Sequence, residues 1–462
     1  MLIAFVLFYL ALNLAVGWWA SKKVHTTQDF VLAGRNLPFA LAAMVTFATW
    51  FGSETILGAP REFVHGGVMA IIEEPLGAAL GLIIAGGIYA RKLYALQVLT
   101  FSDYFRQRFG SFSEKLSAVV MVPSYFGWIS AQLVALGLTL HLLLPISTEW
   151  GIVLGALLVM TYTLLGGMWS ISITDFVHNI ILILGLAFLC FLLFQQHPNL
   201  AAAVEKQPAD FFRFTPSDRD AVSWLKYLAA WITIGLGSIP QQDIFQRVMS
   251  AKSARVASTA SFSAGIMYLS VAILPLLIAF MGVSLYPSLM EEDMLLIPHL
   301  VMKFTPTSMQ ILFLGALLSA LLSTTSGAIL APASVLGENL IKPYMCHPSD
   351  KKVLFMIRLS VIGVTMVCIY MAIKRQNIFE LVGESSAFGL VSLFLPLNAG
   401  LWWKKASPVG SHLSMILGLV VWAYFQFIAP DAIPSIWFGL AASLLGLLLG
   451  TYAWPNPPKA VE

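Results

Sequence analysis

The sequence predicts an all-α polytopic membrane protein. Of its 462 residues, 58% are hydrophobic and only 11% are charged, and the mean hydropathy is +0.83. Soluble domains carry a charged share of about 25%. Apolar runs of membrane-spanning length also recur along the whole chain, with no long polar domain between them. These observations predict about 13 transmembrane helices in a lipid bilayer.

The predicted spans follow one another through short connections. Counting apolar runs of about 17–25 residues places them near 1–20, 38–65, 68–90, 116–144, 150–167, 173–195, 224–246, 257–283, 308–341, 354–373, 378–402, 408–428 and 433–453. The first run lacks the basic start and the cleavage region of a signal peptide, so we expect a retained helix.

Basic residues gather in alternate connections between the spans. They are Lys22, Lys23 and Arg35, then Arg91, Lys92, Arg106 and Arg108, then Arg247, Lys252 and Arg255, then Lys342, Lys351 and Lys352, and finally Lys404 and Lys405. Cytoplasmic loops are enriched in Lys and Arg. The pattern therefore predicts a multi-pass protein of the plasma (inner) membrane, with its amino terminus outside and its carboxyl terminus in the cytoplasm.

Two of the predicted spans are interrupted by glycine and proline. The second contains Gly52, Ser53, Glu54, Gly58 and Pro60, and the seventh contains Gly235, Gly237 and Pro240. One such break is commonly a simple proline kink, but non-helical backbone at membrane depth is tolerated where it lines a cavity. The breaks lie five spans apart, which gives them opposite orientations. Paired breaks of this kind indicate the binding site of an inverted-repeat transporter.

The ninth span contains four consecutive hydroxyl residues, Ser323, Thr324, Thr325 and Ser326. Four residues wrap about one turn of helix, so these hydroxyls cannot all face one way. Hydroxyl oxygens without carboxylates suit a weakly held monovalent cation. A polar seam between packed helices is an equally good interpretation of this stretch alone.

Four motifs in order resemble the sodium/solute symporter family. They are AGRNL (33–37), LLGGMWSISITDFVHNI (164–180), IPQQDIFQRVMSAKSA (239–254) and ALLSTTS (320–326). The resemblance implies two inverted five-helix repeats with discontinuous helices and sodium-coupled import of a small-molecule solute. It divides the chain into a first peripheral helix and cytoplasmic loop (1–37), a first repeat (38–195), an extracellular loop (196–223), a second repeat (224–403), and two peripheral helices with a tail (404–462).

The resemblance also implies where sodium binds. The ligands would be the hydroxyls of Ser323 and Thr324, together with the backbone carbonyls of Ala48, Phe51 and Ala320. A second candidate sodium site combines Asp175, Ser323 and Ser326. At that second site Gly327 stands where a further hydroxyl would contribute.

Within the family, the likeness is strongest to choline carriers and their bacterial relatives. FATWFGSE (47–54) and FGWISAQLVALG (126–137) place Trp50 and Trp128 at matching tryptophans, whereas Gln241 replaces a third. Aromatic faces bind quaternary ammonium by cation–π attraction, but an amide suits a carboxylate or hydroxyls. An amine such as choline or betaine and an amino acid such as proline both remain open. The predicted substrate-binding residues are Trp50, Gly52, Ser53, Glu54, Trp128, Gln132, Gly237 and Gln241.

Several acidic residues fall inside or near the spans. Glu54 is expected to meet a substrate ammonium, carry a proton or pair with Arg61, because an intramembrane carboxylate is costly. Glu73 and Glu74 are expected to be solvated near the outer end of the third span. Glu384, with Ser385 and Ser386, faces either a cavity or a neighbouring helix. Asp243 and Gln246–Arg247 form either a gate or structural pairs.

Other function classes lack support in the sequence. It contains no HExxH or Gly-x-Ser-x-Gly motif, so we expect no enzyme. Its three cysteines form no metal or disulfide pattern, and no basic cluster indicates nucleic acid. Nothing indicates an obligatory protein partner. The alternatives that remain are proton-coupled uptake and a transporter-derived sensor, although the chain ends about ten residues after its last predicted span.

Overall fold

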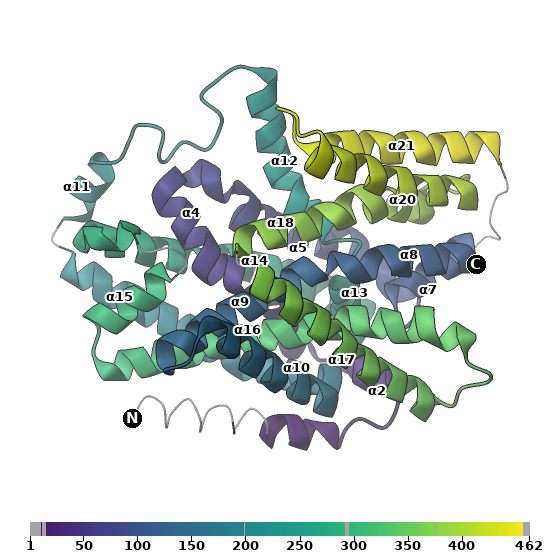
Figure 1. Ribbon diagram of the computed structural model, residues 1–462, viewed down its shortest axis with the longest axis horizontal. Helices are drawn as coiled ribbons and strands as arrows, with labels where there is room; N and C mark the ends of the chain where they lie inside the picture. The colour runs from purple at the N-terminus through teal and green to yellow at the C-terminus, as the bar shows by residue number, and fades with distance from the viewer. Residues whose placement is uncertain (1–10, 12–14, 198, 292–294, 376, 456–462) are drawn as a thin grey trace.

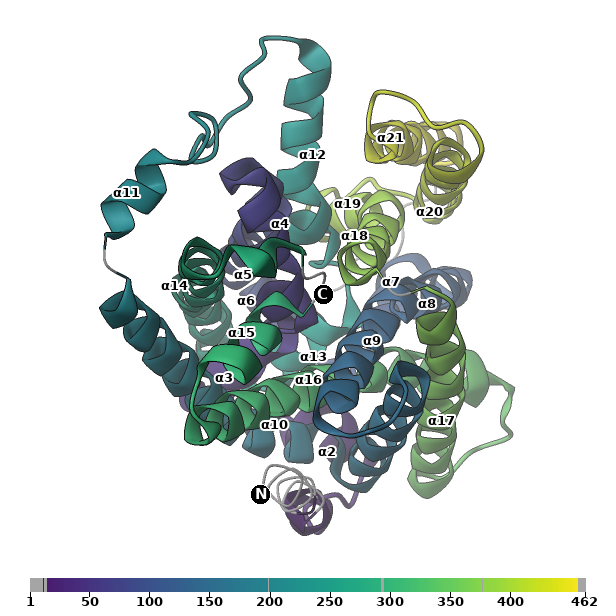
Figure 2. The same ribbon diagram turned by 60° about the vertical axis from the view of Figure 1, so that its left-hand side comes forward.

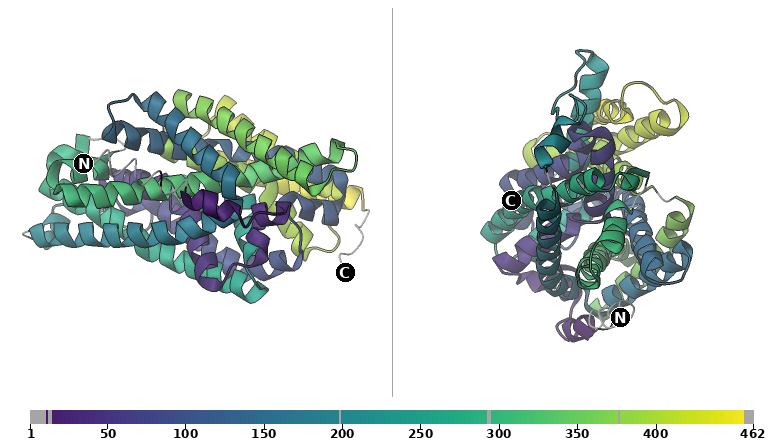
Figure 3. Two further views of the ribbon diagram at one scale, coloured as in Figure 1. Left: turned by 90° about the horizontal axis from the view of Figure 1, so that it is seen from below. Right: turned by 90° about the vertical axis from the view of Figure 1, so that its left-hand side faces the viewer.

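The computed structural model describes residues 11, 15–197, 199–291, 295–375 and 377–455 (Figure 1). Over these residues the regular structure is helical, and a single β-bridge joins Leu37 to Ala251. The long helices run broadly along the long axis of the molecule (Figure 3). This confirms the predicted all-α class.

The α-helices vary widely in length. They are α2 (Thr27–Leu32), α3 (Phe39–Trp50), α4 (Ala59–Gly66), α5 (Ala78–Ile84), α6 (Ala90–Ala95), α7 (Phe101–Phe109), α8 (Ser111–Ser124), α9 (Phe126–Leu143), α10 (Thr148–Gln196), α11 (Leu200–Glu205), α12 (Ala221–Gly237), α13 (Gln242–Ser250), α14 (Ala254–Leu285), α15 (Leu296–Phe304), α16 (Thr307–Val335), α17 (Asp350–Lys374), α18 (Ile378–Gly389), α19 (Leu395–Trp402), α20 (Pro408–Ala423) and α21 (Ser435–Ala453). Several are extended by wider π-helical turns, of which η2 (Glu54–Gly58) and η4 (Ile72–Gly77) lie near the site described below.

The described residues contain nine helices that are long and apolar enough to cross a membrane, or eleven if two bent pairs each count as one span. Another apolar helix, Thr148–Thr161, is shorter. The predicted first span, near 1–20, falls mainly on residues outside the described ranges. The count of about 13 spans therefore stays a prediction.

Gly167 separates the spans predicted at 150–167 and 173–195. It lies inside α10 with φ 49° and ψ −139°, which is not helical. A β-carbon there would lie 2.4 Å from the Phe30 carbonyl oxygen of α2. Only glycine combines a positive φ with so close an approach of another backbone. The interruption of α10 at Gly167 therefore lies directly before the connection predicted between residues 167 and 173.

Both predicted breaks are present. α3 ends at Trp50 and the chain resumes at Glu54 with a bend of 58°, whereas α12 and α13 meet at 48° across residues 238–241. At the first break the Gly52 amide donates to the Trp50 carbonyl at 3.0 Å. In a continuous helix that amide would donate to Ala48. The break therefore frees the Ala48 carbonyl from the helix ladder.

The centre and the edge of the bundle differ in burial. α16 belongs to the most buried of the candidate spans, with 89% of its most apolar stretch inside the molecule. It packs against α3, α9, α10, α13 and α17. α20 and α21 instead lie side by side at the margin (Figures 1 and 2). The hydroxyl-rich helix is thus central, where polar side chains must find partners inside the protein.

Candidate functional site

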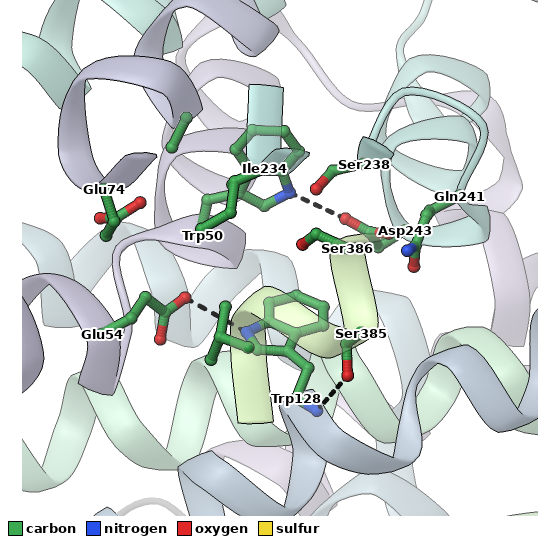
Figure 4. Close-up of a pocket in the computed structure, with 12 residues that line it drawn as sticks. Trp50, Glu54, Glu74, Trp128, Ile234, Ser238, Gln241, Asp243, Ser385 and Ser386 are labelled. Atoms are coloured by element: carbon green, nitrogen blue, oxygen red, sulfur yellow. Dashed lines mark hydrogen bonds between the residues drawn. The ribbon is translucent and has the colours of Figure 1, made fainter. Parts of the chain in front are cut away.

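A cavity of about 400 Å³ opens beside the two breaks (Figure 4). It is lined by Trp50, Glu54, Glu74, Ala78, Trp128, Ile234, Ser238, Gln241, Asp243, Val382, Ser385 and Ser386. Figure 4 shows Glu54 and Glu74 on one side and Gln241 and Asp243 on the other, with the two tryptophans between them. Three carboxylates and two indoles therefore surround one small space.

Glu54, the first residue after the first break, is 4% exposed and well supported. One carboxylate oxygen accepts from the Trp128 indole N–H at 3.2 Å, and the other accepts from the Gln132 amide at 2.6 Å. The Gln132 carbonyl in turn accepts from the Ser53 backbone N–H at 3.0 Å, which fixes the orientation of the amide. Glu54 is thus held by neutral donors, while Arg61, its predicted structural partner, forms an ion pair with Glu62.

The prediction that Glu74 is solvated is wrong. Its side chain is only 1% exposed and lines the cavity. Its carboxylate accepts from the Thr55 hydroxyl at 2.7 Å and from the Tyr268 hydroxyl. Thr55 and Tyr268 come from η2 and α14, which cover Glu74 from two directions. Glu73, its neighbour, lines a separate and more open depression with Glu380 and Glu384.

Asp243 brings the second break to the cavity. Its two carboxylate oxygens accept from the Tyr125 hydroxyl at 2.6 Å and from the Trp50 indole N–H at 2.9 Å. The Asp243 backbone N–H donates back to Tyr125 at 2.9 Å. These bonds connect α13 to α3 and to the start of α9. The first break and the second break are therefore joined directly through one carboxylate.

The predicted substrate residues divide into three groups. Trp50, Glu54, Trp128 and Gln241 line the cavity. Gly52, Ser53 and Gln132 gather behind Glu54, since a β-carbon on Gly52 would lie 2.8 Å from oxygens of both Gln132 and Glu54. Gly237 instead packs against α18, where a β-carbon would lie 2.3 Å from the Ser386 carbonyl oxygen.

Sequence reasoning missed Glu74 as a lining residue and left Ser385 and Ser386 open between a cavity and a neighbouring helix; all three line the cavity. Ser385 accepts from the Trp128 backbone N–H at 2.9 Å. A usable signal for Glu74 was its place in an apolar run directly before Pro75. For Ser385 and Ser386, the signal was adjacent hydroxyls within an apolar span. Glu384, beside them, forms an ion pair with Arg375 at 2.7 Å.

The structure joins part of the predicted sodium site. The Thr324 hydroxyl donates to the freed Ala48 carbonyl at 2.9 Å, which links α16 to the first break. Phe51 lies at the break, as the residue that caps α3, and Ala320 lies one turn before Thr324 on α16. Backbone carbonyls at an unwound helix and nearby hydroxyls are typical ligands for a transported alkali cation.

The second candidate sodium site is also partly assembled. The Ser323 hydroxyl donates to the Asp175 carboxylate of α10. Ser326, however, turns back and donates to the Ser323 carbonyl at 2.8 Å. Among the described residues, no three His, Cys, Asp or Glu side chains cluster as a multivalent metal would require.

The chain is similar in sequence to known membrane transporters. The chain is 27% identical to the high-affinity choline transporter 1 of Caenorhabditis elegans, covering 91% of this chain and 77% of that protein. It is 28% identical to the high-affinity proline transporter PutP of Bacillus subtilis, covering 97% of each.

Solved structures show the same fold at low identity. A substrate-bound, outward-open Na⁺-coupled sialic acid symporter superposes with a TM-score of 0.86 at 18% identity, covering 99% of this chain and 98% of that one. Mhp1, a nucleobase-cation-symport-1 family transporter, superposes at 0.61 and 17% identity, covering 92% and 93%. A family model matches residues 30–418, well over half of the chain. The chain therefore belongs to the sodium:solute symporter family and is a sodium-coupled solute transporter of the membrane.

Proposed function

We propose that this protein imports a small organic cation, an amine of the choline type, together with sodium. The observation that carries the proposal is the cavity between the two breaks, in which two indoles and three carboxylates converge. Its described lining contains no lysine or arginine. A positively charged solute matches both features, because it gains from the negative charge and from the aromatic faces.

The carboxylates favour an amine over a zwitterion. Glu54 and Glu74 accept only from neutral donors in the hydrogen bonds described above. The charged form of two buried carboxyl groups without a cationic partner is unfavourable unless a ligand supplies the positive charge. An amino acid would bring its own carboxylate into the same small cavity, where like charges repel. Gln241 and the serine hydroxyls could bind that carboxylate, so an amino acid such as proline is the second candidate.

The indoles supply the complementary part of recognition. Trp50 and Trp128 each use the indole N–H to bind a carboxylate, Asp243 and Glu54 respectively. These hydrogen bonds hold the rings in place without occupying their faces. A cation over a desolvated indole face gains about 0.5–2 kcal/mol. The missing third aromatic residue at Gln241 suggests a cation with a hydroxyl or other polar group on that side.

Sodium would bind between α3 and α16, at the carbonyls of Ala48, Phe51 and Ala320 and the hydroxyls of Ser323 and Thr324. Its binding would hold the first break against α16, and so shape the cavity that begins two residues after Ala48. Inward movement of one positive charge gains about 2.3 kcal/mol per 100 mV of membrane potential. We place the amino terminus outside and the carboxyl terminus in the cytoplasm of the plasma membrane, following the basic loops.

The proposal is tested by uptake into proteoliposomes. Labelled choline, betaine, proline and a primary diamine are compared with and without an inward sodium gradient, and separately with a proton gradient. We expect sodium-driven uptake of an amine, competed by other amines and not by proline. Uptake of proline alone would show that the substrate is an amino acid and not an amine. Uptake driven only by a proton gradient would contradict sodium coupling.

Two variants locate the result in the structure. Thr324→Ala removes a proposed sodium ligand and should raise the sodium concentration needed for half-maximal uptake. Trp128→Ala removes one aromatic face and should weaken amine affinity by roughly 2- to 30-fold. Trp150→Ala, at an indole that is 64% exposed, is the control and should leave both unchanged.

A further inference from the structure

A second hollow lies behind α18, away from the central cavity. It is an open depression of about 1440 Å³ between α12, α18 and the α20–α21 pair (Figure 2). Ser385 and Ser386 of α18 line the cavity, whereas Gly383, Glu384 and Ala387 line the depression. With 3.6 residues per turn, these two sets lie on different faces of the helix. α18 therefore forms a wall between the two hollows.

Glu73 and Glu74 connect the depression to the cavity. Glu74 lines the cavity and Glu73 lines the depression. The backbone at Glu74 is extended, with φ −140° and ψ 119°, and neighbouring side chains of extended backbone point to opposite sides. The Glu73 Oε1 atom lies against α18, since a β-carbon on Gly383 would be 3.4 Å from it. Two adjacent residues thus supply a carboxylate to each hollow.

Two polar groups that line the depression are buried without a partner. Neither Glu73 Oε1 nor the Trp422 indole N–H makes a hydrogen bond to the described residues. Trp422 is only 3% exposed. Buried polar groups of native proteins are nearly always paired, so each of these two requires an explanation. One accepts and carries negative charge, and the other only donates. Together they match a molecule that has a positive group and an acceptor oxygen.

The rest of the lining favours the same class of molecule. Its acidic residues are Glu73, Glu380, Glu384 and Asp431. Its aromatic residues are Phe379, Trp422 and Phe425. Glu384 is already paired with Arg375 at 2.7 Å, and the one cation among the described lining residues is Lys226. Carboxylates and aromatic faces both attract organic cations.

We propose that this depression is a second binding site for an organic cation, separate from the central cavity. The ammonium group lies near Glu73 and the exposed rim carboxylates of Glu380 and Asp431, and an oxygen of the same molecule accepts from the Trp422 indole. A free amine of the choline type and the headgroup of phosphatidylcholine share this chemistry. The place of the site on the outer side rests on the orientation in the proposed function, whereas the ligand class follows from the lining of the depression itself.

The test is fluorine NMR of the full-length protein labelled with fluorotryptophan, in nanodiscs of phosphatidylglycerol, whose headgroup carries no ammonium. The Trp422 resonance is the one that Trp422→Phe lacks. Added choline should shift it saturably, and should still do so in Glu54→Gln/Trp128→Ala, which disables the central cavity. Glu73→Gln should raise the choline concentration for half-maximal shift at least about fivefold. Glu205→Gln is the control, because Glu205 is exposed and lies outside the depression.

Each outcome bears on the site. The absence of a saturable shift, or its loss in Glu54→Gln/Trp128→Ala, would overturn the proposal. A resonance already shifted in phosphatidylcholine nanodiscs, and returned by Glu73→Gln, would support the site with the lipid headgroup as its ligand. If Glu73→Gln fails to fold, Asp431→Asn at the exposed rim should raise the half-maximal concentration in the same direction. A choline-induced shift without amine uptake would refute the proposed function and leave this second site standing.

Discussion

The two broken spans hold their carboxylates in different ways. At the first break Glu54 accepts from an indole and an amide, both of them neutral. At the second break Asp243 accepts from Tyr125 and Trp50, and the buried Arg247 lies one turn further along α13. The second break is thus compensated from within the protein, whereas the first leaves a negative charge for a ligand. Similar backbone breaks therefore serve structure in one case and binding in the other.

Asp243→Asn tests the compensated side and should have the largest effect. The change places an amide N–H opposite the Trp50 or Tyr125 donor and removes the carboxylate one turn before the buried Arg247. Leaving a buried hydrogen-bonding group without its partner costs about 1–3 kcal/mol, and more for charged groups. We expect a clear fall in the midpoint of thermal unfolding of the purified protein. Asp243→Asn combined with Arg247→Gln should recover part of the loss, and equal stability of the single variant and the natural protein would refute internal compensation.

Glu54→Gln tests the uncompensated side. The variant removes a buried carboxylate that accepts only from neutral donors among the described hydrogen bonds, so stability should stay the same or rise slightly. The affinity for an amine should instead fall at least about tenfold, because a charged hydrogen bond contributes about 1.5–3 kcal/mol. Competition of labelled amine uptake measures this. Glu114→Gln is the control for affinity, since Glu114 is also buried but binds Asn339 and Arg106 and does not line the cavity; an equal loss of affinity in both variants would contradict the assignment.

Much of the fold could be predicted from the sequence because its signals are local. Glycine and proline inside apolar runs marked both breaks, and Gly167 is the last residue of the span predicted at 150–167. The four hydroxyls of α16 marked the helix that lies deepest in the bundle. The family motifs then led to Thr324 and Ala48, which the structure brings into contact although they lie 276 residues apart.

The rest of the site could not be predicted, because its contacts are long-range. Asp243 meets Trp50 and Tyr125 across 193 and 118 residues, and no local pattern encodes such pairings. Glu74 was expected at a wet helix end, but Tyr268, 194 residues away, covers it. Gly327 of α16 packs against the Arg247 side chain of α13, 80 residues earlier, where a β-carbon would lie 2.3 Å from Nη2. The local sequence around each of these residues is unremarkable, and its role follows only from its tertiary contacts.

The two tryptophans allow a further comparison of the breaks, because Trp128 donates to Glu54 at the first break and Trp50 donates to Asp243 at the second. Trp128→Phe keeps an aromatic face and removes one donor to Glu54, which retains Gln132 and Ser53. Amine affinity should therefore fall less than in Trp128→Ala, and stability should change less than in Trp50→Phe. Trp50→Phe removes the donor to buried Asp243 and should also lower the free energy of unfolding by about 1–3 kcal/mol. Uptake competition and thermal unfolding measured on both variants separate these effects. A stability loss in Trp128→Phe as large as that in Trp50→Phe would contradict the distinction.

The glycines of the two breaks provide the smallest and most local test. A β-carbon on Gly58, at the end of η2, would lie 3.6 Å from Phe379, an ordinary contact, so Gly58→Ala should change stability by less than about 1 kcal/mol. A β-carbon on Gly237 would lie 2.3 Å from the Ser386 carbonyl oxygen, and backbone cannot yield as a side-chain end can. Overpacking of this kind costs about 1–3 kcal/mol, and here it would push α12 away from α18, whose Ser385 and Ser386 line the cavity. Gly237→Ala should therefore lower both thermal stability and amine affinity, whereas Gly58→Ala should lower neither. If the two variants behave alike, the close packing of α12 against α18 does not shape the cavity, and the second break contributes to it through Asp243 and Gln241 alone.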